Sequence, residues 1–275
     1  MEAILKYDFM RRAFIVGILL AFIIPCVGII VVLKRLSMIG DALSHTSLAG
    51  VTAGLVMSIN PILGSIIACI IAALGIEVIR KKIPKYAEMS IAIIMSAGVG
   101  LAGVLSGFVK NSANFSSFLF GSIVAISNFE MLLVILISCA VMLTFFFLYK
   151  ELFYIALDER SARLAGIPVK TVNFVFTILT AVTVSVAART VGALIVSSLM
   201  VIPVACAMQF GKSYKQTVIY SVCFAVFFMA AGLYISYYQR LKPGGTIVLI
   251  GVICLVFILI IKGITASIIL TKDKL

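Results

Sequence analysis

The sequence contains a single histidine, His45, which lies four residues after Asp41 in the stretch MIGDALSHTSLAG (residues 38–50). On a helix, residues i and i+4 lie one turn apart on the same face. A carboxylate oxygen and a neutral imidazole nitrogen are a suitable ligand pair for a divalent transition-metal ion. Two ligands are too few for tight binding, and a site from which the ion must leave needs that incompleteness. We therefore predict that Asp41 and His45 hold a divalent metal ion transiently.

The composition predicts that these two residues belong to a membrane protein. Of the 275 residues, 63% are apolar and 12% are charged, and the mean hydropathy is +1.27. A soluble domain carries about a quarter charged residues, so lipid must be the solvent for much of this surface. The net charge of +12 then indicates lysine and arginine held on the cytoplasmic side, rather than a surface for nucleic acid. Six cysteines stand singly in apolar runs without a CxxC pair, which is typical of buried small hydrophobic residues.

Nine apolar segments are long enough, or nearly so, to cross the hydrocarbon core, which takes about 20 helical residues. The second is the weakest, because polar side chains crowd its start. If one weak segment fails to span, the count is eight. The short apolar piece Phe115–Ile126 could form a re-entrant or surface helix. We expect an all-α, polytopic helical bundle of eight to nine transmembrane helices, forming one membrane domain over residues 1–275. The nine segments are Ala13–Leu33, Gly40–Met57, Pro61–Ile79, Met89–Phe108, Phe129–Tyr149, Thr171–Ala188, Val191–Phe210, Val218–Tyr237 and Thr246–Ile261.

Lysine and arginine are unevenly divided between alternate loops, and this predicts the orientation. Of the 22 such residues, fifteen fall in the set of loops that includes Lys34 and the segment around Arg160. We therefore expect these loops and the C-terminus to be cytoplasmic and the N-terminus to be outside. Arg11 and Arg12, on the outer side, are the weak point of this assignment.

The Asp41–His45 pair has a second interpretation. Asp41 could cap the helix that begins near it, and His45 could be a hydrogen-bonded core histidine. We favour the ligand interpretation, because an ionisable residue at membrane depth is costly and by default marks a pathway. Nearby small residues permit close helix packing, as in the small-xxx-small patterns Gly50–Gly54 and Gly103–Gly107.

One polar loop, Ile155–Pro168, predicts a short helix with a capping start, charges of both signs, and a glycine and proline as its end. Its size suits docking into a partner's groove, although a solvated loop helix is an equally good interpretation. The stretch CAMQFGKS (residues 206–213) looks like the end of a phosphate-binding loop, but it lacks the first glycine and a preceding strand. We therefore predict that this chain is not an enzyme and has no nucleotide site of its own.

Four stretches give the chain a clear resemblance. They are VVLKRLSMIGDALSHTSLAG, LDERSARLAGIPV, VGALIVSSLMVIPVACA and LKPGGTIVLIG, and they extend from residue 31 to residue 251. The chain resembles the permeases of the bacterial ABC-type zinc/manganese/iron importer family. The appearance of LKRLSMIGDALSHTSLAG is closer to the zinc branch, with manganese as the alternative.

The resemblance implies a multi-pass protein of the bacterial cell membrane that imports a divalent metal. It implies a homodimer of permeases, two cytoplasmic ATPase subunits and an extracytoplasmic metal-binding protein that delivers the ion. The metal-coordinating aspartate and histidine of the family motif fall on Asp41 and His45. The ATPase-coupling segment falls on Asp158, Glu159, Arg160, Arg163 and Gly166.

Three other classes of function are alternatives to a permease of an ATP-driven importer. An ion-coupled secondary carrier would need no ATPase and would use the same Asp41. An intramembrane enzyme would need paired catalytic residues or an HExxH motif, which the sequence lacks. A purely structural membrane protein would not need the Asp41–His45 pair.

Overall fold

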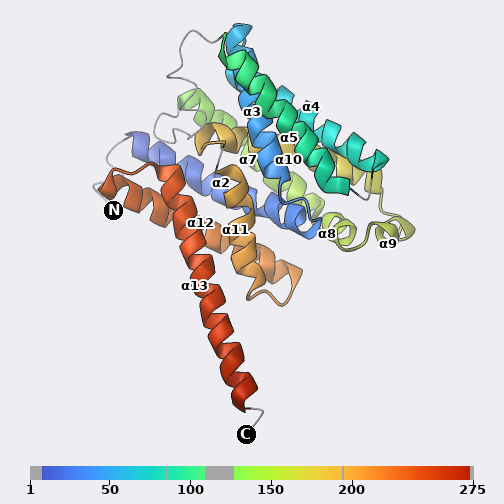
Figure 1. Cartoon of the computed structure of the whole chain (residues 1–275), viewed down its shortest axis with the longest axis vertical. Coiled ribbons are helices and arrows are strands. Elements are labelled where there is room, and N and C mark those ends of the chain that lie inside the picture. The colour runs from blue at the N-terminus through green and yellow to red at the C-terminus, as the bar shows by residue number, and fades with distance from the viewer. Residues whose placement is uncertain (1–7, 84–85, 109–126, 194, 273–275) are drawn as a thin grey trace.

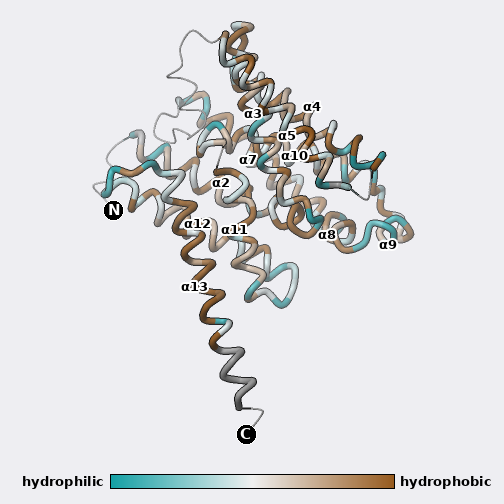
Figure 2. The backbone as a smooth tube through the Cα atoms, viewed as in Figure 1, coloured by the Kyte–Doolittle hydropathy of each residue, from teal (hydrophilic) through white to brown (hydrophobic). Residues whose placement is uncertain are grey.

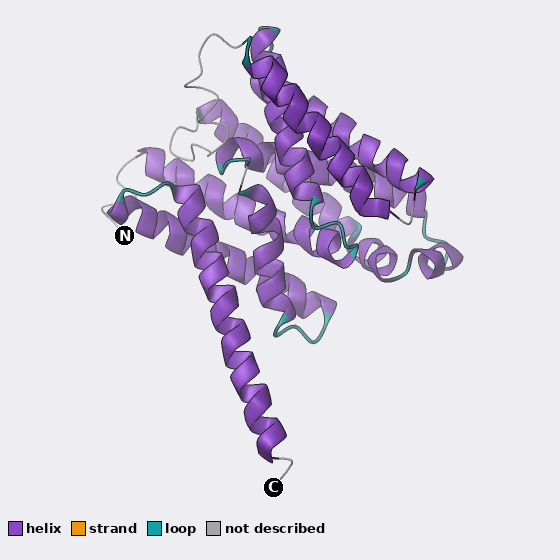
Figure 3. Ribbon diagram, viewed as in Figure 1, coloured by secondary structure: helices purple, strands orange, loops and turns teal. Residues whose placement is uncertain are grey.

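Every element of the chain in the computed structural model is a helix, within the residues that the structure describes: 8–83, 86–108, 127–193 and 195–272 (Figures 1 and 3). Phe115–Ile126, for which a re-entrant helix was considered, lies outside these residues. The helices are α2 (Asp8–Leu33), α3 (Ile39–Val56), α4 (Pro61–Lys82), α5 (Ala87–Ser106), α7 (Asn128–Phe147), α8 (Tyr149–Leu157), α9 (Glu159–Leu164), α10 (Val169–Thr190), α11 (Val196–Met208), α12 (Tyr214–Gln239) and α13 (Pro243–Lys272).

Seven of these helices are long and apolar enough to cross a membrane: α2, α4, α5, α7, α10, α12 and α13. Each of the nine predicted segments coincides with a helix, and the two outside the seven are α3 and α11. Polar residues lower the hydropathy of α3, while α11 has only 13 residues. The predicted segment Val191–Phe210 is shortened because Val191, Gly192 and Ile195 lie outside the helix. The chain is thus a polytopic helical membrane protein.

The helices divide into a buried centre and a lipid-facing periphery. In α2 and α10, 72% of the membrane-length window is buried within the chain, whereas in α13 the share is 17%. Helix α13 extends away from the body of the molecule (Figure 1) and is apolar from Ile247 to Ile261, where Lys262 interrupts the apolar run (Figure 2). Since lipid tails are as apolar as leucine, such a helix needs no polar face.

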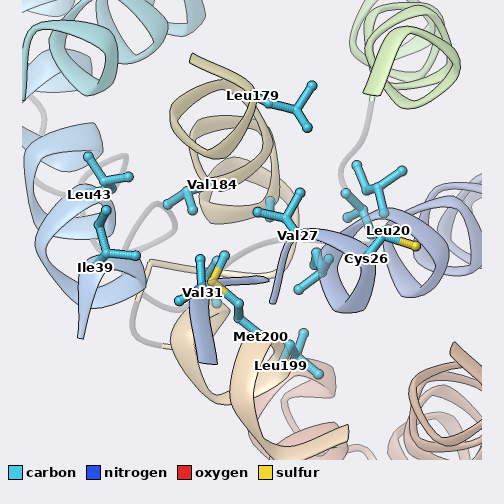
Figure 4. Close-up of a cluster of buried hydrophobic side chains, with 14 of the residues drawn as sticks. Leu20, Cys26, Val27, Val31, Ile39, Leu43, Leu179, Val184, Leu199 and Met200 are labelled. Carbon is cyan, nitrogen blue, oxygen red and sulfur yellow. The ribbon is translucent and has the colours of Figure 1, made fainter. Parts of the chain in front are cut away.

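The centre is formed where α2, α3, α10 and α11 meet (Figure 4). Apolar side chains from all four helices interlock there, and this cluster fixes where the start of α3 lies relative to α11. The labelled members are Leu20, Cys26, Val27 and Val31 from α2, Ile39 and Leu43 from α3, Leu179 and Val184 from α10, and Leu199 and Met200 from α11.

Helix α3 lies directly against α4 at a glycine contact. A Cβ on Gly50 would lie 2.4 Å from the carbonyl oxygen of Gly64, and one on Gly54 would lie 3.0 Å from Cα of Pro61. The small-xxx-small pattern Gly50–Gly54 therefore packs within the chain, as expected of such motifs. The similar pattern at Gly103 has no such contact, because a Cβ there would meet no atom within 4 Å.

Candidate metal site

Asp41 and His45 both lie in the first turns of α3, at the i and i+4 positions that the sequence predicts. From Ile39 to Leu48, every residue except Asp41 and His45 is buried. Asp41 and His45 are both partly exposed and lie on the same face of the helix. The arrangement places a carboxylate and an imidazole, both partly exposed, on one face of a helix that is otherwise buried from Ile39 to Leu48.

Asp41 does not cap its own helix. The N-cap residue of α3 is Met38, which makes no side-chain cap bond. Instead, Oδ1 of Asp41 accepts a hydrogen bond from Oγ of Ser197, at 2.8 Å. Ser197 belongs to the first turn of α11, 156 residues further along the chain. The carboxylate therefore joins α3 to α11, and the capping interpretation of Asp41 is wrong.

Within the described residues, no group of three or more His, Cys, Asp or Glu side chains could hold a metal ion. Asp41 and His45 can supply one oxygen and one nitrogen ligand. Because a tetrahedral zinc site uses four ligands, the remaining positions would be filled by water, by hydroxyl or carbonyl oxygens, or by a second copy of the chain. The pair suits an ion that binds briefly and then moves on.

A buried hydroxyl cluster lies beside this site and links three helices. Oγ of Ser65 on α4 lies 2.7 Å from Oγ of Ser47 on α3 and 2.6 Å from Oγ of Ser185 on α10. The thiol of Cys69 donates to the carbonyl oxygen of Leu43, with a sulfur–oxygen distance of 3.3 Å. These bonds satisfy polar groups that lipid could not, and they hold α3 between α4 and α10.

Toward one end of the bundle, Lys34 lies in a small cavity of about 20 Å³ that also borders Ile39. Its Nζ donates to Oδ1 of Asn173 at 2.6 Å and lies 5.0 Å from the ring centroid of Phe176. The pKa of Lys34 is lowered to about 8, chiefly by burial and then by the positive charge of Arg80, against the opposing effects of Glu77 and Glu159. We call this the Lys34 end.

At the other end of α10, Arg189 pairs with Glu130 of α7 at 2.7 Å. Glu130 also completes a capping box with Ser127, since each accepts a hydrogen bond from the other's backbone N–H. This arrangement fixes the start of α7 against the end of α10. We call this the Glu130 end; α3 runs between the two ends, with Ile39 beside the Lys34 cavity and Leu48 beside Arg189.

The predicted short helix in the polar loop is α9. Asp158 is its N-cap and accepts from the backbone N–H of Arg160 at 2.9 Å; the hydroxyl of Ser161 and this N–H hold the pKa of the Asp158 carboxyl below its usual value. Gly166 ends the helix with φ +83°. Its N–H bonds to the carbonyl oxygen of Arg163, and Ile167 N–H bonds to that of Ala162, which is a Schellman motif.

The charged residues predicted to couple to an ATPase thus lie together on one short, exposed helix. Glu159 and Arg163 form an ion pair at 3.1 Å across one turn, and both are exposed. Leu164 is 90% exposed, although it is apolar. Figure 1 places α9 at the margin of the molecule, beyond α8. The two candidate groups are therefore separate: the structure does not bring α9 to the Asp41–His45 pair.

Sequence reasoning missed Ser197 and Lys34. The hydropathy of Val196–Met208 reveals a packed helix but not which of its serines meets Asp41. Lys34 counted only as a loop charge, whereas the structure half-buries it beside Asn173. A lysine directly at the end of a long apolar run, followed closely by an acid in the next run, is the one signal that could have drawn attention to it.

Known proteins resemble this chain along almost its whole length. Residues 6–262 match the ABC 3 transport family. A protein of Treponema pallidum described as a "Probable metal transport system membrane protein" is 34% identical, over 93% of this chain and 96% of its own. The manganese transport system membrane protein MntC of Listeria monocytogenes is 30% identical, over 92% and 90%. The high-affinity zinc uptake system membrane protein ZnuB of Haemophilus influenzae is 26% identical, over 93% and 97%.

Solved structures agree with these relatives. The structure described as PsaBC from Streptococcus pneumoniae in complex with Fab has a chain with a TM-score of 0.84 and 26% identity, and the match covers 94% of this chain and 93% of that one. On the family match and the Treponema relative together, this protein belongs to the ABC 3 transport family.

Proposed function

We propose that this protein is the membrane permease subunit of an ATP-driven importer of divalent transition-metal ions. The observation that carries the proposal is the Asp41–His45 pair, partly open on a helix that is otherwise buried between Ile39 and Leu48. An ionisable pair at membrane depth is costly and marks a pathway. The relatives named for zinc and manganese transport support the same class of cargo.

We propose zinc as the cargo, with manganese as the alternative within the same family. Imidazole nitrogen with a carboxylate oxygen suits zinc, for which four ligands in a tetrahedron are typical. Manganese prefers carboxylate, carbonyl and water oxygens, and it could use the same pair with more water. The relatives include one of each name.

A second copy of the chain would complete the site. Asp41, His45 and Ser197 are each partly exposed in the single chain, and a carboxylate facing lipid would be strongly unfavourable. A homodimer with a two-fold axis beside the start of α3 would cover this opening and bring two ligand pairs together.

The partner on the cytoplasmic side would be an ATPase that receives α9. A short helix with exposed charges of both signs and the exposed Leu164 has the features of a docking element. Glu159 of α9 and Arg80 both influence the pKa of Lys34, so the Lys34 end lies on the same side of the bundle as α9. If α9 meets the ATPase, the Lys34 end faces the cytoplasm. With this orientation the N-terminus is outside, the C-terminus is inside, and a metal-binding protein would deliver the ion at the Glu130 end.

The experiment is metal uptake into proteoliposomes by the permease with its ATPase and its binding protein. Zinc and manganese are compared directly, with and without ATP. We expect ATP-dependent uptake that His45→Ala and Asp41→Asn abolish, while both variants still assemble. The control is Glu88→Gln, which neutralises an exposed acid at the start of α5 and should transport normally.

Full uptake by His45→Ala at limiting metal would overturn the proposed site. Uptake that needs no ATP and follows a proton or sodium gradient would favour the ion-coupled carrier instead.

A further inference from the structure

We propose that Ser197 is a positioning residue for Asp41: it orients the carboxylate that binds the transported metal and links that carboxylate to α11. The inference rests on the proposed function and extends it to a residue on a different helix. The direct observation is the 2.8 Å hydrogen bond from Oγ of Ser197 to Oδ1 of Asp41.

The surroundings of Ser197 favour a negatively charged partner. Ser197 lies in the first turn of α11, whose N-cap residue Ile195 makes no side-chain cap bond. The first N–H groups of a helix have no acceptor within the helix, and the helix dipole places partial positive charge there. The hydrogen bond places the carboxylate of Asp41 at this end of α11, where the hydroxyl of Ser197 and the helix dipole both attract it.

Close backbone packing holds the donor in place. A Cβ on Gly40 would lie 3.1 Å from Cα of Ser197, and one on Gly28 would lie 2.2 Å from the carbonyl oxygen of Met200. The absence of side chains at these two glycines lets α3 and α2 both lie directly on the start of α11. Ser197 therefore has little freedom to move unless α11 moves as a whole.

The hydrogen bond gives the two carboxylate oxygens of Asp41 different roles. Oδ1 accepts from Ser197, and in the proposed site Oδ2 binds the cation together with the imidazole of His45. Hydrogen bonds of this kind to metal-binding carboxylates orient the ligand, and their loss typically costs about 10- to 100-fold in metal affinity or activity. A displacement of α11 would remove the donor from Asp41 and weaken the site, so the position of α11 and the retention of the ion are coupled.

The test compares four variants in the purified permease–ATPase complex without the binding protein. Ser197→Val and Ser197→Thr form an isosteric pair in which only threonine keeps the hydroxyl. Ser197→Ala removes the hydroxyl without adding bulk. Ser198→Ala is the matched control, because the next residue points about 100° further round the helix and is equally half-buried.

Equilibrium binding of radioactive zinc and manganese ions is measured for each variant, alongside thermal stability and assembly. We expect Ser197→Val and Ser197→Ala to weaken metal binding about 10- to 100-fold, with stability and assembly close to the wild type. Ser197→Thr should bind within about three-fold of the wild type, by the same reasoning on the retained hydroxyl. Ser198→Ala should be unchanged.

Two outcomes would overturn the inference. The first is wild-type metal binding by Ser197→Val and Ser197→Ala. The second is an equal loss in Ser197→Thr and Ser197→Val, which would mean that bulk or packing, and not the hydroxyl, is what matters.

Asp41→Asn and His45→Ala are measured in the same series. If they bind and transport metal normally, the proposed metal site itself is wrong. If they lose metal while Ser197→Ala keeps it, only the role of Ser197 is wrong.

Discussion

Two charged side chains inside this bundle, Asp41 and Lys34, are each held by one neutral partner from a distant helix. Ser197 donates to Asp41, and Asn173 accepts from Lys34. A charge removed from water needs such partners, because the low dielectric surroundings penalise it strongly. Asp41 is partly exposed, whereas Nζ of Lys34 lies 5.0 Å from the ring centroid of Phe176. The two residues therefore differ in role: Asp41 is the proposed metal ligand, and Lys34 carries a penalty that depends on pH.

Lys34 predicts a rise in stability at alkaline pH. Burial lowers its pKa from 10.5 to about 8, so between these values the unfolded chain binds more protons than the folded chain. Stability should then increase as the pH rises from about 8 to about 10.5, by about 3 kcal/mol, and the full penalty is present below pH 8.

Thermal unfolding in detergent checks this prediction. Lys34→Met should flatten the rise over that pH range, while Lys170→Met, which removes an exposed lysine, should keep it. An equal rise in the wild type and in Lys34→Met would mean that another group titrates.

At the scale of helices, a glycine brings two helix backbones together only where it faces a neighbouring helix. Gly50 on α3 and Gly103 on α5 stand in similar sequence patterns, yet only Gly50 touches a neighbouring backbone. The physical cause is that α3 is packed inside the bundle, whereas only 22% of the membrane-length window of α5 is buried. The same motif can therefore serve tight packing in one helix and no contact within the chain in another.

Gly50→Ala should destabilise the protein. Its new Cβ would lie 2.4 Å from the carbonyl oxygen of Gly64 and 2.6 Å from Cβ of Ala68, so α3 and α4 would have to separate. Overpacking of this kind costs about 1–3 kcal/mol. Gly103→Ala is the matched control and should be neutral or slightly stabilising, since alanine favours a helix over glycine by up to about 1 kcal/mol. Unfolding monitored in detergent distinguishes the two, and equal stability of both variants would contradict the contact.

Helix α9 should couple the bundle to the ATPase without contributing to its stability. Replacing Arg160 and Arg163 with glutamate reverses two exposed charges, so the membrane helices should stay folded. We expect loss of assembly, or ATP hydrolysis that no longer responds to metal and its binding protein. The control is Lys242→Glu, which reverses the charge of an exposed residue directly before α13. Unchanged co-purification and unchanged coupled ATPase activity in the double variant would rule out this role for α9.

At the scale of the whole molecule, the open side of the Asp41–His45 pair argues that a single chain is incomplete. The chain buries α3 between α4, α5, α10 and α11, and Gly50 and Gly54 are covered by α4 rather than left for a second copy. Between Ile39 and Thr52 of α3, Asp41 and His45 are the residues left partly exposed, and Ser197 of α11 beside Asp41 is also half-buried. A two-fold dimer would therefore meet there and not along the glycine motif.

A mixed dimer tests whether the two chains share one site. One chain is wild type and the other carries Asp41→Ala and His45→Ala, with two different affinity tags to isolate the mixed species. A shared four-ligand site predicts the loss of most metal uptake, because half of the ligands are gone. Half of the wild-type uptake or more would show that each chain binds its own ion.

The local features of this protein were determined by the sequence itself. Apolar length predicted nine segments that each coincide with a described helix, seven of which are long and apolar enough to cross a membrane. The Asp158 cap and Gly166 bounded α9, and the spacing of Asp41 and His45 put them on one face. Each of these depends on residues within a turn or one helix length of each other. The tertiary structure alone decided that Ser197 meets Asp41, that the half-buried Lys34 donates to Asn173, and that Gly50 is packed while Gly103 is not. The reason is that lipid is about as apolar as a helix neighbour, so hydropathy along a membrane helix does not distinguish the face that meets lipid from the face that meets another helix.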